Sequence, residues 1–476
     1  MGFPEETQVI HCDFCGSSLL VAGRHGVLRY ALAPRMIQEA KRARSIAQEQ
    51  LRRRGRPSPH PTETFMFYAP FWRVQGTAFR WVFGLKTLPV EPGGVPFPPA
   101  ERVKELFTRV LDHTTAACST VDVGMSNLGV RPQVLELRPL GGDLPVKEAS
   151  LLPLDITLDR VQAESFRLSE AHLAGKDELV PEVILHRLVG RRFSVIYLPI
   201  WYVELEYSGG REFLLMDAVD GRVIHITGGD SDIPMRLMAG EGRESLRFGE
   251  IRFLPFRCPN CGWAFPFRPM SVLHLCPTCH RLWCEARGEW TEVSYDVAAP
   301  PGGRPWTGLL WVPFWRYRTR LLSHGASKET MADLYRLAPP PKAVSLEREA
   351  RRPIQFYVPA MRLPNPKATH DLSSRITFVQ PEVSSGPFPD AVHPATAGGS
   401  LPETDAREMG ALILGAIIPP GSRPARSWLK GCEVEMLEPR VRYFPFERKD
   451  LFWKELWTGV TFPHSERAPD LLGAKG

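Results

Sequence analysis

Residues 258–280 read CPNCGWAFPFRPMSVLHLCPTCH, and this stretch decides one part of the fold. Its two C-x-x-C pairs, with fourteen residues between them, are Cys258, Cys261, Cys276 and Cys279. Two thiolates three residues apart bind one metal ion from a tight turn, and a short hairpin brings the second pair beside the first. The spacing predicts a zinc ribbon. Four sulfur ligands leave no open coordination position, so we expect structural Zn²⁺.

The alternative for the second pair is redox chemistry, because Cys276-Pro-Thr-Cys279 taken alone resembles an active dithiol. That chemistry requires the pair at the start of a helix, and here an upstream pair lies within hairpin reach instead. Gly262 follows the first pair, where a knuckle requires a permissive backbone. His274 and His280 flank the second pair, and we interpret them as surface residues rather than ligands.

A further pair, Cys12 and Cys15, has no matching pair nearby in the sequence. His11 and His25 could add ligands, or a partner chain could complete the site. The third alternative is that no metal binds, since two ligands alone hold zinc poorly. We therefore treat Cys12 and Cys15 as a weaker metal-site candidate.

Composition places the chain among globular, multidomain proteins. It has 476 residues, of which 43% are hydrophobic and 24% charged. Proline is unusually frequent at 46 residues, which favours many short strands and structured loops. Reduced thiolates that hold zinc fit a cytosol-like compartment, so we expect a cytoplasmic protein.

No membrane segment or secretory signal is expected. The first residues, MGFPEETQ, are polar and acidic. The longest strongly apolar run, Met409 to Ile418, is followed by two prolines and is much shorter than the roughly 20 residues that span a bilayer. Peripheral membrane contact remains compatible with this pattern.

The chain's net charge of +6 is concentrated in one segment. Between residues 34 and 56, eight cations face only Glu39 and Glu49, and they are Arg35, Lys41, Arg42, Arg44, Arg52, Arg53, Arg54 and Arg56. A helix here could present a solvated face, bind an acidic protein, or contact nucleic acid or an anionic membrane. A helical wheel spreads half of these cations away from one side, so we expect nucleic-acid binding to be weak.

A short aromatic–x–proline phrase recurs along the chain. The best copies are Tyr68-Ala-Pro-Phe-Trp-Arg and Trp311-Val-Pro-Phe-Trp-Arg, and weaker copies begin at Tyr197, Phe253, Tyr357 and Tyr443. Period-two alternation follows each proline and predicts strands that begin there. We interpret the aromatic residues as core, with base stacking as the alternative.

Elsewhere the patterns predict one β-meander and a few amphipathic helices. The meander has strands at 201–207, 211–216 and 222–226, joined by turns at Ser208-Gly-Gly and Asp220-Gly. These hairpins make the sheets antiparallel. Helices are expected at 34–54, at 101–113, from an N-cap at Ser327 to about Leu337, and at 405–418.

The expected fold is mostly β (α+β), with antiparallel sheets, a central four-cysteine ribbon and an internal duplication. Each half would carry a C-x-x-C pair followed by a Pro-Phe-Trp-Arg strand. The predicted domains are a single-knuckle segment (1–33), a basic helix and linker (34–60), a first β-rich domain (61–245), the ribbon (250–298) and a second β-rich domain with helices (304–476).

No sequence motif marks a catalytic site. The phosphate-binding, nucleophile-elbow, zinc-protease and dinucleotide-binding patterns do not occur, and the acidic residues near Asp217 and Asp230 are typical of turns. We therefore expect a scaffold or interaction protein with an unidentified protein partner. A nucleic-acid-associated ribbon factor is the first alternative, and an enzyme with an unrecognised site is the second.

The order of these parts resembles a group of uncharacterised bacterial zinc-ribbon proteins. The resemblance is carried by CPNCG and CPTC, by LPIWYVELEY…DGRV (residues 198–223), and by APRMIQEA (residues 33–40). It covers most of the chain loosely and implies the fold and the metal. Such ribbons are sometimes labelled as similar to those of primosomal helicases, but this chain lacks a nucleotide-binding loop.

Overall fold

The computed structural model describes residues 7–463 except 13, 15, 25, 88–99, 120–121, 130–136, 141–143, 174–178, 229–232, 240–245, 341, 364, 384 and 390–393. Strands dominate these residues, as expected, and they form four sheets. The two smaller, three-stranded sheets contain β1 (Val9–His11), β2 (Ser18–Ala22) and β11 (Arg252–Pro255), and β12 (Leu273–Leu275), β13 (Leu282–Ala286) and β14 (Glu289–Val293).

The two larger sheets have eight and nine strands. The first comprises β3 (Leu28–Ala31), β4 (His60–Thr87), β5 (Ala100–Ala116), β6 (Arg138–Pro139), β7 (Ser150–Leu151), β8 (Leu179–Tyr207), β9 (Gly210–Asp217) and β10 (Val223–Gly228). The second comprises β15 (Tyr295–Ala298), β16 (Leu310–Ser323), β17 (Ala326–Lys328), β18 (Gln355–Pro359), β19 (Ser385–Gly386), β20 (Ala395–Thr396), β21 (Glu433–Lys449), β22 (Phe452–Glu455) and β23 (Thr461–Pro463).

Helices cover the faces and ends of these sheets. They are α1 (Ala40–Arg53), α2 (Leu158–Leu173), α3 (Ile233–Ala239), α4 (Met331–Leu337), α5 (Leu346–Glu349), α6 (Pro366–Val379), α7 (Glu403–Arg407), α8 (Gly410–Ile417) and α9 (Arg423–Leu429). A 3₁₀ turn spans Pro301–Gly303. The expected helix at 405–418 is divided into α7 and α8.

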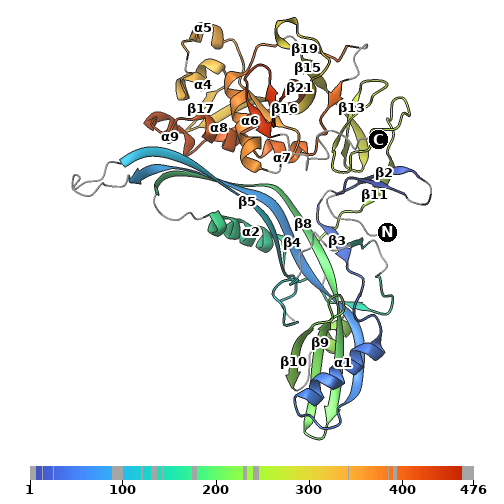
Figure 1. Ribbon diagram of the computed structural model, residues 1–476. Helices are drawn as coiled ribbons and strands as arrows, with labels where there is room; N and C mark the ends of the chain where they lie inside the picture. The colour runs from blue at the N-terminus through green and yellow to red at the C-terminus, as the bar shows by residue number, and fades with distance from the viewer. Residues whose placement is uncertain are drawn as a thin grey trace.

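Two very long strands form the spine of the molecule (Figure 1). β4 has 28 residues and β8 has 29, and they pair antiparallel along almost their whole length. At about 3.3 Å per residue, their contour length is roughly 90 Å. The expected meander is confirmed, because β8, β9 and β10 form consecutive antiparallel hairpins.

The expectation of a helix at 101–113 is wrong, since this segment is strand β5, which pairs with β4 throughout. Its apolar residues have helical spacing because both faces of the strand are partly covered, although Val110 is exposed. Phe107 and Leu111 pack in the cluster on the α2 side, whereas Leu106 packs against the C-terminal half. Two covered faces place apolar side chains at odd and even positions, and this removes the alternation that identifies a half-exposed strand.

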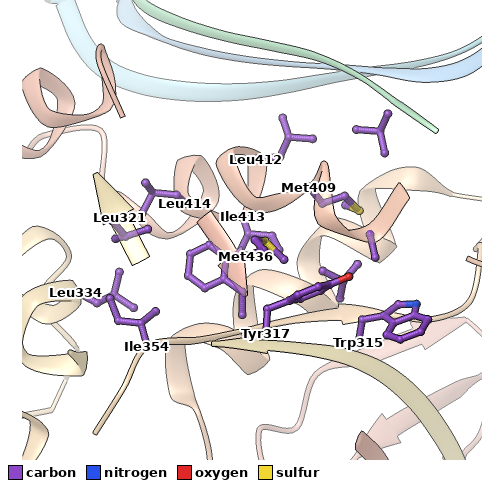
Figure 2. Packing of buried hydrophobic residues seen from close by; sticks show 14 of the residues in the cluster. Trp315, Tyr317, Leu321, Leu334, Ile354, Met409, Leu412, Ile413, Leu414 and Met436 are labelled. Atoms are coloured by element: carbon purple, nitrogen blue, oxygen red, sulfur yellow. The ribbon is translucent and has the colours of Figure 1, made fainter. Parts of the chain in front are cut away.

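The largest core cluster joins both halves of the chain. Figure 2 shows Trp315, Tyr317, Leu412, Ile413 and Met436 packed between the β16–β21 pair and helix α8. The same cluster contains Trp81 of β4 and Leu185 of β8. The C-terminal half is therefore fixed to the far end of the spine by buried apolar surface. The domain boundaries expected from the sequence remain a prediction.

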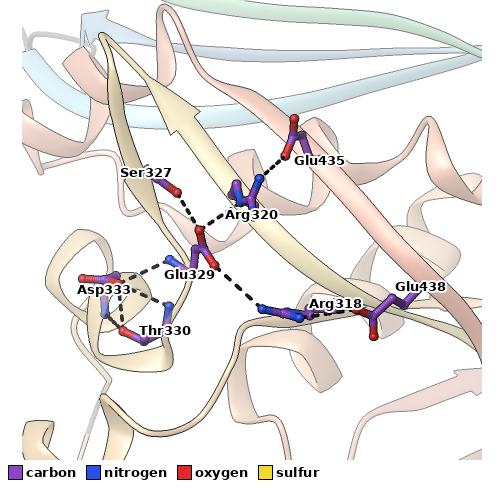
Figure 3. A network of polar contacts seen from close by, with 8 residues as sticks. All are labelled: Arg318, Arg320, Ser327, Glu329, Thr330, Asp333, Glu435 and Glu438. Atoms are coloured by element: carbon purple, nitrogen blue, oxygen red, sulfur yellow. Dashed lines mark hydrogen bonds and ion pairs between the residues drawn. The ribbon is translucent and has the colours of Figure 1, made fainter.

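Helix α4 starts later than expected. Thr330, not Ser327, is its N-cap: the Thr330 hydroxyl accepts a hydrogen bond from the Asp333 N–H at 3.3 Å, and Asp333 Oδ2 accepts from the Thr330 N–H at 3.2 Å. Ser327 belongs to β17, and its hydroxyl donates to Glu329. Figure 3 shows Glu329 also paired with Arg320, so the cap connects β17 to β16.

The aromatic–x–proline phrases lie within strands rather than at their starts, which corrects the sequence expectation. At Pro70, Pro199, Pro313 and Pro445 the strand exchanges one neighbour for another. On the N-terminal side the neighbour is parallel (β7, β3, β20 and β15), and on the C-terminal side it is antiparallel (β5, β9, β18 and β22). Proline is tolerated there because, on the side of the strand where the neighbour changes, no strand residue lies opposite it that would require its N–H.

Candidate metal centre

Three short strands position the four cysteines of the ribbon. β11 leads into the first pair, Cys258 and Cys261, and the turn between β12 and β13 carries the second pair, Cys276 and Cys279. β14 completes the sheet by pairing with β13. The second pair thus lies between antiparallel strands, whereas thioredoxin-like chemistry requires a helix start.

Both cysteine pairs adopt the same hydrogen-bonded turn. The Cys258 N–H donates to Trp263 O at 2.8 Å, and the Gly262 N–H donates back to Cys258 O at 2.8 Å. In the second turn the Cys276 N–H donates to Arg281 O at 2.9 Å, and the His280 N–H donates to Cys276 O at 3.1 Å. Gly262 has φ 76°, which confirms the expected permissive backbone, and His280 adopts a similar φ of 54°.

The four sulfur atoms converge as a tetrahedral metal site requires. All four Sγ atoms lie within 4.8 Å of one another. Cys258 Sγ is 3.6 Å from Cys279 Sγ, and Cys261 Sγ is 3.5 Å from Cys276 Sγ. A ZnS₄ tetrahedron with bonds of about 2.3 Å has edges of about 3.8 Å. The arrangement could therefore hold a metal ion with little rearrangement, and it is the one such group in the part of the chain that the structure describes.

The protonation of these thiols depends on burial and on mutual hydrogen bonds. Burial raises the pKa of Cys258, and it raises that of Cys276 to about 12. Burial also acts to raise the pKa of Cys279, but hydrogen bonds from the Arg281 N–H, Asn260 and neighbouring thiols outweigh it and lower this pKa to about 7. Without a cation the cluster favours one thiolate among thiols, and a divalent cation favours deprotonation of all four.

An aromatic cluster packs against the cysteines of the metal site. Phe256, Phe265 and Trp290 surround the imidazole of His274, whose ring centroid is 4.9–5.5 Å from theirs. His274 is buried at 4% exposure, so the interpretation of this residue as a surface histidine is wrong. Desolvation lowers its pKa to about 3, with the nearby Arg268 charge adding to the effect. His274 is a neutral core residue, and its position between Leu273 and Leu275 in an apolar strand was the available sequence signal.

The N-terminal turn at Cys12 has the same backbone hydrogen bonds. The Cys12 N–H donates to Ser17 O and the Gly16 N–H donates to Cys12 O, both at 2.8 Å, and Gly16 has φ 68°. Cys15 and His25 lie outside the described residues. Metal binding at Cys12 and Cys15 therefore remains a prediction.

Comparisons with family models, curated proteins and solved structures found no match to this chain. The resemblance to bacterial zinc-ribbon proteins consequently remains an expectation from the sequence. In the described part of the chain, no helix is long and apolar enough to cross a membrane.

Proposed function

We propose that this protein is a zinc-stabilised scaffold that binds a protein partner. The observation that carries this proposal is the β4–β8 spine, because it holds separate modules at its two ends (Figure 1). α1 and the β9–β10 hairpin lie at one end, and the C-terminal half is packed on the other. The ribbon lies beside the C-terminal half (Figure 1), and its Leu273 and Leu282 belong to the same buried cluster. Paired strands hold surfaces at fixed separations more precisely than flexible linkers do.

Zinc is the metal that best suits the four-cysteine site. Four thiolates at tetrahedral spacing are the usual structural zinc donor set, and they leave no position for a substrate. Binding free energy at such a site is also folding free energy. We infer that the metal fixes the ribbon rather than performing chemistry.

Metal analysis of the purified protein tests this part of the proposal. We expect one zinc ion per chain in the wild type and a loss of it in Cys261→Ser. Cys284→Ser is the matched control, because Cys284 lies on β13 but outside the metal cluster. A metal-free wild type with a fully folded ribbon would contradict the zinc assignment.

The ribbon presents the surface that we assign to the partner. Trp263 is 59% exposed and Phe267 is 43% exposed, although large aromatic side chains are usually buried in a free protein. Aromatic residues are enriched at protein interfaces, where they contribute much of the binding energy. Both residues lie between the two cysteine pairs, so metal binding would fix the loop that carries them.

Affinity capture with matched variants tests partner binding. The wild-type chain should enrich a protein that a Trp263→Ser/Phe267→Ser double variant fails to enrich. Phe452→Ser is the control, since Phe452 is similarly exposed (45%) but lies on β22. Zinc content checks that the double variant is folded. The proposal fails if no protein is enriched above a tag-only sample, or if all variants capture the partner equally.

A second candidate function, nucleic-acid association, is favoured by the solvent face of α1. The helix packs through Ala43, Ala47 and Leu51, and all of its cations are exposed. Only Arg53 has an ion pair within the helix, with Glu49 at 3.0 Å. Every cation of α1 faces solvent, and the expectation that half of them point away from a single partner surface remains a prediction.

A further inference from the structure

Strand β5 forms a long free edge of the eight-stranded sheet. It pairs with β4 from Ala100 to Ala116, and within the described chain it pairs with no other strand. Residues 100–113 also make no backbone–backbone hydrogen bond beyond those to β4 with any residue that the structure describes. In an antiparallel ladder, an edge strand turns about half of its N–H and C=O groups away from its neighbour. A row of such groups, about 40 Å long, is therefore available to another strand.

The two faces of β5 are largely occupied by the chain itself, so a partner reaches this strand at its edge. Phe107 and Leu111 pack on the α2 side. Leu106 packs against the C-terminal half, and Lys104 donates to carbonyls at the end of α8. Val110 is the exception, because 67% of it is exposed. Backbone pairing is consequently the main contact that this geometry leaves to a second molecule.

The sequence of this edge is complementary to itself in the reverse direction. Residues 101–113 read ERVKELFTRVLDH. Antiparallel pairing of two copies about a two-fold axis at Phe107 places residues that are equally distant from Phe107 opposite each other. Residues directly opposite share one face of the sheet, and opposite charges in such pairs are stabilising. The pairs of opposite charge or of hydrogen-bonding partners are Glu105 with Arg109, Arg102 with Asp112, and Glu101 with His113.

Other symmetric registers lack this complementarity. An axis at Glu105 or at Arg109 places that residue opposite its own copy, and like charges directly opposite each other are destabilising. An axis at Leu106 places no two charges opposite each other, and an axis at Thr108 leaves a single opposite pair on each side. The side-chain pattern therefore favours one register, as a specific strand pairing requires.

The charges nearest the axis are available to a second chain. Arg109 is exposed and has no ion pair or side-chain hydrogen bond to a described residue. Glu105 pairs with Lys86 at 3.6 Å, and both side chains are more than a third exposed. Asp112 already binds Arg73, so the Glu105–Arg109 pair carries most of the complementarity. Charges on an edge strand ordinarily keep copies apart, but the order of signs in β5 brings opposite charges together.

We propose that β5 pairs antiparallel with β5 of a second copy of this chain, about a two-fold axis at Phe107. The two large sheets then form one continuous sheet, and the Glu105–Arg109 pair occurs twice. Each Lys104 lies opposite the exposed Val110 of the other copy, and the aliphatic stem of the lysine covers it. This dimer contact is separate from the metal centre and from the ribbon surface, so it can be tested independently of both.

Sedimentation velocity of the purified full chain, at roughly 1–100 µM, tests the proposal. We expect the wild type to form a dimer at the upper end of this range. Arg109→Glu and Glu105→Arg should each weaken dimerisation at least about tenfold, because each change replaces two attractive cross-strand pairs by two repulsive ones. Arg44→Glu makes the same change of charge on α1, at an exposed position far from β5 (Figure 1), and should dimerise like the wild type.

Mixing the two single variants distinguishes β5 from every other surface. In a mixed dimer of Arg109→Glu with Glu105→Arg, a glutamate faces an arginine in both pairs, so the dimer should return. The double variant that carries both changes in one chain should dimerise as well. Recovery also shows that the single variants are folded. A wild type that is monomeric over the whole range, an Arg109→Glu variant that dimerises like the wild type, or a mixture that stays monomeric would overturn the proposal.

Discussion

His370 is a buried histidine that joins the spine to the C-terminal half. It lies on α6 at 1% exposure, and its Nε2 is 2.8 Å from Leu412 O of α8. The Trp81 indole N–H of β4 donates to the same carbonyl at 3.1 Å. A carbonyl oxygen can only accept, so the 2.8 Å contact places the proton of the neutral imidazole on Nε2. The Trp81 indole N–H, although 3.2 Å from the same nitrogen, then donates to Leu412 O instead.

Stability should therefore depend on pH through His370. Desolvation lowers its pKa to about 4, and the charge on Lys104 acts in the same direction. The unfolded chain has the ordinary value of about 6.5. Between these pH values the unfolded state binds one more proton than the folded state. The free energy of unfolding therefore rises with pH by up to about 1.4 kcal/mol per pH unit, and this stabilisation is lost as the pH falls from 6.5 to 4.

Urea unfolding at several pH values between 4 and 7 measures this slope. His370→Phe should have a shallower slope than the wild type, whereas His172→Phe, at an exposed position, should retain it. The comparison concerns slopes because His370→Phe also removes a hydrogen bond. Identical slopes in the wild type and His370→Phe would show that this histidine is not held neutral.

The sequence was informative at the residue scale where the signal is local. The spacing of Cys258, Cys261, Cys276 and Cys279 is a property of two turns, and the structure brings these thiols together. The burial of His274 depends instead on Phe256 and Trp290, which are distant in sequence. The local signal, its place between Leu273 and Leu275, indicates an apolar strand but does not encode this aromatic environment.

Among the secondary-structure elements, hairpins were predictable and long-range pairs were not. Gly209 and Gly221 mark turns of the meander within a few residues of the strands that they join. β5 was mistaken for a helix because its second covered face comes from helices hundreds of residues later. A strand with two covered faces loses its alternation, so tertiary packing overrides the local pattern.

The proline positions predict a measurable effect on strand stability. Pro313 is buried in β16 where its neighbour changes from β20 to β18, and its carbonyl accepts from the Ala360 N–H at 2.8 Å. Pro313→Ala would add a buried N–H without an acceptor. We expect a loss of about 1–3 kcal/mol in the free energy of unfolding.

Chemical denaturation of Pro313→Ala and Pro57→Ala separates this effect from chain entropy. Pro57 is exposed between α1 and β4. Pro57→Ala should therefore lose only the small amount of stability that follows from greater conformational freedom of the unfolded chain. The interpretation is wrong if both variants lose the same stability.

Helix α1 predicts weak binding to polyanions. Lys41, Arg42, Arg44 and Arg52 are exposed and form no ion pair that the structure records. A helix of this length, at about 1.5 Å per residue, covers only about 21 Å of a phosphate backbone. We therefore expect dissociation constants of roughly 10⁻⁴–10⁻⁶ M near physiological salt, with strong weakening as salt increases.

Mobility-shift titrations at two salt concentrations test this expectation. Arg42, Arg44 and Arg52 changed to Gln together should abolish the shift, and the same change at exposed Arg304, Arg318 and Arg348 should not. Submicromolar affinity retained at about 150 mM salt, and lost on substitution of α1, would favour the nucleic-acid function over the scaffold function.

At the scale of the whole molecule, the two large sheets share one strand-pairing pattern. Tyr68 is opposite Pro199 and Pro70 opposite Tyr197, and the equivalent pairs in the second sheet are Trp311 with Pro445 and Pro313 with Tyr443. In each sheet a short parallel strand, β3 or β15, lies beside the second long strand. We propose that these matching registers reflect the internal duplication expected from the sequence.

The turns that follow β9 and β22, the strands next after β8 and β21, support the same proposal. Asp217 and Glu455 are both fully buried carboxylates at the start of a turn. Each accepts hydrogen bonds from backbone N–H groups of its own turn, and each turn has a glycine with positive φ, Gly221 or Gly459. The sequence indicated the repeated phrase, but not the pairing of β4 with β8, because those strands lie about a hundred residues apart.

The final prediction concerns the attachment of the C-terminal half to the spine. Lys104 of β5 donates from Nζ to the carbonyls of Gly415, Ala416 and Ile418, at 3.3 Å for Gly415 and 2.8 Å for Ile418. These carbonyls end helix α8, where unpaired acceptors and the negative end of the dipole favour a cation. Lys104→Met leaves them without this donor, so we expect a loss of roughly 1.5–3 kcal/mol in stability and faster amide exchange in α8.

Lys86→Met is the matched control, because it removes a lysine from the same sheet. Lys86 pairs with Glu105 at 3.6 Å, with both side chains more than a third exposed, and such a surface ion pair contributes about 0–1 kcal/mol. Thermal unfolding combined with hydrogen exchange distinguishes the two variants. If the two variants lose equal stability, or if exchange in α8 is unchanged in Lys104→Met, then the buried apolar cluster alone holds the halves together and the lysine contributes nothing specific.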